Sequence, residues 1–155
     1  MSKNKPKKQP VFRVQPDTEK KPKSESFNLT PGFPKFKGGH LGWRFSSADK
    51  ASGPFSWSNL NDAGEYKDVL EKLHQFETMN EHAIVNGGSH TVDVANLCTA
   101  AQRRLEELRI DDVDYLMSFR VGAKPRIWCR PNGHIMMVLW WDPNHQVCPS
   151  PKKGT

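Results

Sequence analysis

The last third of the chain carries cations and an imidazole, among them Arg120, Arg126 and His145, that could hold a phosphate next to a proton-transfer group. A guanidinium suits the phosphate because it donates two parallel hydrogen bonds to phosphate oxygens. An imidazole, whose ordinary pKa is near 6.5, can take or give a proton close to neutral pH. Such a combination makes RNA chemistry the first function to consider.

Further basic and aromatic residues of the same segment are candidates for substrate binding. They are Arg130, Trp128, Trp141, Lys152 and Lys153. Cations attract the nucleic-acid backbone, and indole rings can stack on unpaired bases. Trp140 and Trp141 are neighbours on an expected strand and must point to opposite faces, so we expect one in the core and the other at a packing or stacking surface.

The candidate catalytic residues also have structural interpretations. His145 follows residues 142–144 and could close a turn by hydrogen bonding to Asp142. The two arginines could pair with the acidic run at residues 111–114, an arrangement that contributes little stability when it is exposed. His90 follows Gly87-Gly88-Ser89 in a glycine-rich loop, where a lone histidine is more often exposed than catalytic.

The elements that must position these residues begin with a strand and two helices. Alternating apolar residues from His40 to Ser47 predict the strand. Apolar residues on one helical face predict a helix over 63–79, and the capping-box form of Thr99-Ala100-Ala101-Gln102 predicts a second helix over 99–109.

Three strands are expected to follow. Residues 115–121, 126–130 and 134–141 are rich in aromatic and aliphatic side chains, and Asn132-Gly133 is a strong hairpin signal. The order strand, helix, helix and three-stranded antiparallel meander predicts a single small α+β domain over residues 39–155.

The positive charge of the chain is concentrated at its N-terminal end. Residues 1–40 hold ten Lys and Arg against three Asp and Glu, a surplus of seven that exceeds the +6 of the whole chain. Residues 1–38 also have few large apolar side chains and no periodicity, which predicts a disordered basic arm that confers solubility or attracts RNA.

Composition also limits the cellular setting and the cofactors. Cys98, Cys129 and Cys148 form no CxxC pair, which favours a reducing cytoplasm over a disulfide scaffold. We find neither a secretory signal nor a long apolar run, so no membrane association is expected. The histidines are spaced unsuitably for a compact metal site, and no cofactor is expected.

The order of elements, together with Ser118-Phe119-Arg120, Arg126-Ile127-Trp128 and the segment Asp142-Pro143-Asn144-His145-Gln146-Val147, resembles the RelE/ParE superfamily of bacterial toxins. The resemblance covers about residues 40–150. It implies a RelE-like fold and an endoribonuclease toxin of a toxin–antitoxin system, which cleaves mRNA on the ribosome and has an antitoxin protein as partner.

The resemblance also implies roles for single residues. Arg120 and Arg126 match the strand-borne arginines that hold the scissile phosphate, and His145 matches the acid or base near the end of the sheet. Many ribonucleases of that superfamily end the meander with a tyrosine, where this chain has Cys148. Members directed against gyrase lack the nuclease residues, so the fold alone does not fix the activity.

Two other functions are compatible with the sequence. One is a non-catalytic module that binds nucleic acid or an acidic protein, whose affinity would fall steeply with salt and survive the loss of His145. The other is inhibition of a partner protein through exposed aromatic side chains of residues 128–141.

Overall fold

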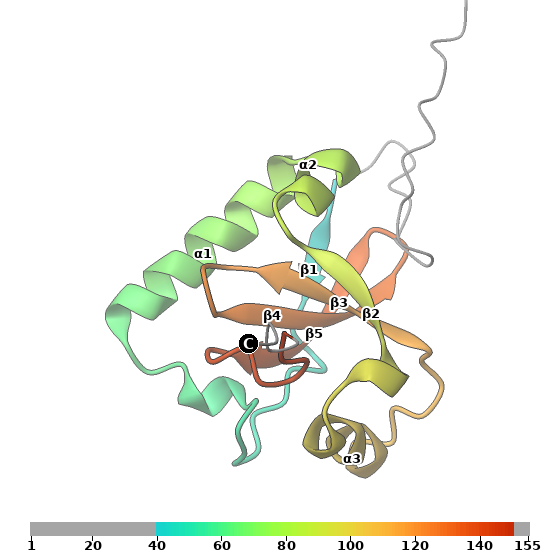
Figure 1. The fold of residues 1–155 in the computed structure, drawn as a ribbon. Helices are drawn as coiled ribbons and strands as arrows, with labels where there is room; N and C mark the ends of the chain where they lie inside the picture. Colours follow the sequence, from blue (N-terminus) through green and yellow to red (C-terminus); the bar gives the residue numbers. More distant parts are fainter. Residues whose placement is uncertain (1–39, 151–155) are drawn as a thin grey trace, which may run out of the picture.

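The computed structural model describes residues 40–150 (Figure 1). The basic arm, Lys152 and Lys153 lie outside these residues, so the expectations for them stay predictions. The elements in chain order are β1 (Gly42–Arg44), η1 (Trp57–Asn59), α1 (Ala63–Thr78), α2 (Glu81–Asn86), β2 (His90–Asp93), η2 (Val94–Asn96), α3 (Thr99–Glu107), β3 (Tyr115–Arg120), β4 (Arg126–Asn132) and β5 (Ile135–Asp142).

Five strands form one mixed sheet in the order β1-β5-β4-β3-β2. Strand β1 runs parallel to β5, whereas the other neighbours are antiparallel. The expected α+β class and the C-terminal meander are confirmed. Strand β2 was not expected; it has only four residues and becomes a strand by pairing with β3.

The two longer helices lie close to their predicted ranges, and α1 begins where expected because Asp62 accepts a hydrogen bond from the Glu65 amide at 3.0 Å. The cap of α3 differs from the capping box expected at Thr99. Cys98 is the capping residue, and its Sγ accepts a hydrogen bond from the Ala101 amide at 3.4 Å. Strand β1 is shorter than the predicted strand over residues 40–47.

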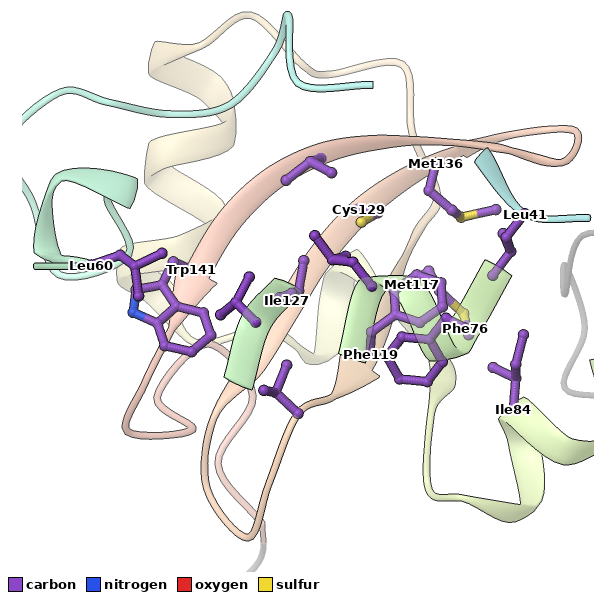
Figure 2. Packing of buried hydrophobic residues seen from close by; sticks show 14 residues of the cluster. Leu41, Leu60, Phe76, Ile84, Met117, Phe119, Ile127, Cys129, Met136 and Trp141 are labelled. Carbon is purple, nitrogen blue, oxygen red and sulfur yellow. The ribbon is translucent and has the colours of Figure 1, made fainter. Parts of the chain in front are cut away.

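One face of the sheet packs against α1 and α2. Figure 2 shows this core, in which Phe76 of α1 and Ile84 of α2 lie over Phe119 and Ile127 of the sheet. Phe76 and Phe119 have ring centroids 5.1 Å apart. Trp141 belongs to this core and is 1% exposed.

The opposite face packs against α3 and the segment that follows β5. Leu105 of α3, Leu116 of β3, Trp140 of β5 and Val147 belong to this second core. The segment is held beside α3 because the Cys98 amide donates to the Val147 carbonyl at 2.8 Å. Both faces of the sheet are therefore covered by packed segments. A functional site needs a place where this packing leaves a cavity.

Candidate functional site

A cavity of about 250 Å³ opens on the α3 face of the sheet, and we call it the Arg126 cavity. Its walls come from β2, β3, β4 and the segment after β5. The lining residues are His90, Val92, Ser118, Arg126, Trp128, His145, Cys148, Pro149 and Ser150. Two of the three predicted catalytic residues, Arg126 and His145, therefore share one cavity.

Strand register explains why these residues meet. His90 of β2 lies opposite Ser118 of β3, which in turn lies opposite Trp128 of β4. Directly paired residues share a face of an antiparallel sheet, so all three point to the α3 side. Arg126 is two residues before Trp128 and shares that face.

A second row across the strands carries the charges. Arg120 of β3 lies opposite Arg126 of β4, and Arg126 lies opposite Asp142 of β5. Like charges placed directly opposite each other destabilise a sheet. This row therefore has two cations and one carboxylate facing the same side.

Arg126 is buried, with only 8% of the residue exposed. Its Nη1 donates to the carbonyls of Gly122 at 2.9 Å, Lys124 at 3.1 Å and Pro125 at 3.0 Å. Within residues 40–150, Nε and Nη2 have no hydrogen-bond acceptor. Burial and the neighbouring Arg120 lower the pKa of Arg126, against a smaller opposing effect of Asp142.

Arg120 is exposed and is not among the residues that line the cavity, but its charge contributes to lowering the pKa of both Arg126 and His145. Its Nε donates to the Gly122 carbonyl at 3.2 Å, and its amide donates to Ser89 Oγ at 3.0 Å. The charge of Arg120 therefore acts on both of the other predicted catalytic residues. In the described part of the chain, neither Arg120 nor Arg126 forms an ion pair, so the predicted pairing with residues 111–114 is not observed.

The segment Gly88-Ser89, which precedes β2, lies against Arg120. Gly88 has a φ of +93°, and a Cβ built on it would lie 3.1 Å from Arg120 Cδ and 3.2 Å from Arg120 Nη1. Ser89 is fully buried where it accepts the Arg120 amide. The segment Gly88-Ser89 therefore sets the position of Arg120.

Asp142 builds the loop that carries His145. This carboxylate, 1% exposed, accepts hydrogen bonds from Trp128 Nε1 at 3.2 Å and from the amides of Gln146 and Val147 at 2.8 and 3.0 Å. His145 has a φ of +56° at the tip of this turn. The carboxylate thus closes the turn through backbone amides, and no hydrogen bond joins it to His145 among the described residues.

His145 is half-buried, and its surroundings favour the neutral imidazole. Burial and the charge of Arg126 lower its pKa, with smaller contributions from His90 and Arg120, while Asp142 acts in the opposite direction. A neutral ring near pH 7 is ready to accept a proton.

No family model, curated protein or solved structure matches this chain. Nor do residues 40–150 contain a helix that is long and apolar enough to cross a membrane. Within the same residues, no three His, Cys, Asp or Glu side chains are grouped so that they could hold a metal ion.

Two of the expected substrate-binding residues are buried and cannot stack on a base. Trp128 lines the cavity, but it is 1% exposed and its indole N–H is bonded to Asp142. Trp141 lies in the core on the opposite face, stacked against Trp57 with ring centroids 5.9 Å apart. Trp140 is also buried, where its Nε1 donates to Asp49 at 3.2 Å, so neither of the adjacent tryptophans forms a surface.

Arg130 does not join the cavity. It is near the other end of β4, where its Nη2 donates to Asp112 Oδ2 at 2.7 Å in an exposed ion pair. It lines a different cavity with Leu108 of the α3 end and Met137 of β5. The substrate contact expected for Arg130 is therefore not at this site.

Cys148 lines the Arg126 cavity. Its thiol donates to the Asn96 carbonyl at 3.4 Å, and burial, followed by Cys98 and Asp142, raises its pKa. The thiol is therefore protonated at neutral pH and is a poor nucleophile.

His90 is the cavity residue that sequence reasoning undervalued. It was expected to be exposed in a loop; it is exposed, but it is the first residue of β2 and lines the same cavity as His145. Only the register between β2 and β3 brings it there. The segment His90-Thr91-Val92-Asp93 is too short to show the alternation of apolar and polar side chains that predicts a strand.

Proposed function

We propose that this domain is an endoribonuclease that holds the scissile phosphate of single-stranded RNA with Arg120 and Arg126 and uses His145 as the general base. The observation that carries the proposal is the charged row across β3, β4 and β5 beside an imidazole-lined cavity.

That row has two positive charges and one negative charge, which favours the binding of an anion. Both oxygens of Asp142 already accept hydrogen bonds from Trp128 and from backbone amides. Arg126 Nε and Nη2 keep unused donors within the described residues. A phosphate would accept these donors, offset the repulsion from Arg120 and stabilise both guanidinium groups.

The cavity also has the chemistry that cleavage needs. His145, held neutral by its surroundings, accepts the proton of the ribose 2′-hydroxyl. The 2′-oxygen then attacks the phosphorus, and the two guanidinium groups stabilise the charge on the pentavalent phosphorane. These groups act without a metal ion, so the reaction should proceed in the presence of EDTA.

A direct test uses the full chain and an unstructured, end-labelled RNA in EDTA, with DNA of the same sequence as control. We expect cleavage of RNA alone, which leaves a 2′,3′-cyclic phosphate and a 5′-hydroxyl. Arg120→Ala should lower the rate about 100-fold because it removes a donor to the transition state. Arg44→Ala, which changes an exposed arginine of edge strand β1, should leave the rate unchanged.

The same assay separates cleavage from binding. His145→Ala should abolish cleavage while the protein still retains the RNA on a filter. An intact RNA that wild type binds but never cleaves would refute the nuclease and favour the non-catalytic binding module.

The wider proposal is that this nuclease is the toxin of a toxin–antitoxin pair and cleaves mRNA on the ribosome. Induced expression of wild type should then arrest bacterial growth, and Arg120→Ala should relieve the arrest. Unimpaired growth with wild type, despite RNA cleavage by the purified protein, would reject the toxin role alone.

A further inference from the structure

We propose that His90 is the general acid of this site, which protonates the 5′-oxygen as it leaves; this rests on the proposed ribonuclease function. The chain would then cleave RNA with a pair of imidazoles, one on each side of the Arg126 cavity.

The fold brings the two imidazoles to the cavity from separate elements. His90 begins β2, whereas His145 is in the turn after β5, and both line the cavity beside Arg126. They are near enough for the charge of His90 to affect the pKa of His145. The buried guanidinium between their elements is where a phosphate would be held.

The hydrogen bond of His90 fixes which ring nitrogen can transfer a proton. Its Nδ1 lies 3.1 Å from the carbonyl oxygen of Thr91. A carbonyl can only accept, so Nδ1 carries a hydrogen, and Nε2 is left as the atom that exchanges a proton with substrate.

The division of roles follows from the two environments. His145 is half-buried beside Arg126, which disfavours its charged form and makes it the base. His90 is exposed, and the Thr91 carbonyl accepts its Nδ1–H. The contact leaves Nε2 as the atom that donates to substrate.

The reaction balances with these two groups alone. The 2′-hydroxyl proton passes to His145, the bond from the 2′-oxygen to phosphorus forms, and the bond from phosphorus to the 5′-oxygen breaks. The 5′-oxygen receives the Nε2 proton of His90. The products are a 2′,3′-cyclic phosphate and a 5′-hydroxyl, and solvent returns each histidine to its starting state.

The charged groups around the two imidazoles also affect the pKa of His145. Arg120 of β3 and Arg126 of β4 oppose protonation of His145, and Asp142 of β5 favours it. The remaining titratable group of the lining is Cys148, whose raised pKa keeps it neutral. The neutral base and the protonated acid together predict a bell-shaped dependence of the cleavage rate on pH.

The test compares two RNA substrates, one with the natural 5′-oxygen and one with sulfur as the bridging 5′-atom. A thiolate leaves without being protonated, so it needs no general acid. His90→Gln should lower cleavage of the natural substrate at least about 100-fold and flatten the alkaline side of its pH profile, but it should cleave the sulfur substrate at nearly the wild-type rate. His145→Ala should fail on both substrates.

His74→Gln, a change of an exposed histidine on α1, serves as the matched control and should behave as wild type. Equal loss of both substrates in folded His90→Gln, or no loss of either, would overturn the role of His90 while leaving the nuclease in place. A wild-type protein that cleaves neither substrate would overturn the proposed function itself.

Discussion

Replacing Asp142 by asparagine should destabilise the domain by about 2–3 kcal/mol, although the side chain keeps its size. The carboxylate accepts three hydrogen bonds while almost fully buried: Oδ2 receives Trp128 Nε1 and the Val147 amide, and Oδ1 receives the Gln146 amide. An asparagine carbonyl can replace only one of these oxygens, and its NH₂ group then faces a donor.

The magnitude follows from that count. Two bonds at the retained oxygen change from charged to neutral acceptors, at a loss of about 0.5–1 kcal/mol each. The Gln146 amide loses its acceptor, which costs about 1–3 kcal/mol and is at the lower end because this amide is partly buried and reaches water. The sum is about 2–3 kcal/mol.

Urea unfolding at pH 7, followed by tryptophan fluorescence, measures this change. Asp111→Asn is the matched control, because that carboxylate is exposed, and it should shift stability by less than about 0.5 kcal/mol. RNA cleavage by Asp142→Asn should also fall, since the turn that holds His145 loses its anchor. A loss of stability below 1 kcal/mol would show that the carboxylate does not hold this turn.

Two further changes probe the supports of the fold and of the site. Arg104→Ala removes the guanidinium whose Nε and Nη2 donate to Asp49 at 2.8 and 2.9 Å, and it should cost about 3 kcal/mol at pH 7 because a buried carboxylate loses its charged partner. These hydrogen bonds lower the pKa of Asp49. The wild type therefore gains stability above the ordinary carboxyl pKa of about 4 and loses it as the pH falls below that value. In thermal melts the variant should lose less stability than wild type between about pH 5 and pH 3. Gly88→Ala places a Cβ at a φ of +93° against Arg120, so we expect about 1–2 kcal/mol of destabilisation in urea and slower RNA cleavage, and an unchanged rate would contradict the positioning role of this glycine.

The sequence was most informative where its pattern is long and local. Apolar spacing predicted α1 and the capping-box pattern predicted α3, each within a few residues of its observed ends, and Asn132-Gly133 marked the turn between β4 and β5. Strand β2 has only four residues, and its partner is more than twenty residues away along the chain, so no local pattern could reveal it. The RelE/ParE resemblance stays a prediction.

The candidate site depended on register as well as residue type. Arg120 and Arg126 were chosen for their guanidinium groups, and their direct opposition across β3 and β4 is a tertiary fact that the sequence did not contain. Trp141 was expected at a surface. Its burial could not be predicted from the sequence, because Trp57, which stacks against it, lies in a distant segment of the chain. Arg130 was grouped with the other strand arginines, but a distant aspartate, Asp112, holds it elsewhere.

The pairing of β1 with β5 has a consequence for synthesis of the protein. Gly42 is registered against Ile135, so the first strand of the sheet has no partner until almost the whole domain has left the ribosome. Contacts this distant in sequence make folding slow relative to that of helical bundles. The turn that holds His145 follows β5 and is made later still. A nascent chain would therefore carry the arginines proposed to bind phosphate before it carries the proposed base, and the proposed nuclease activity would appear only once synthesis of the domain is complete.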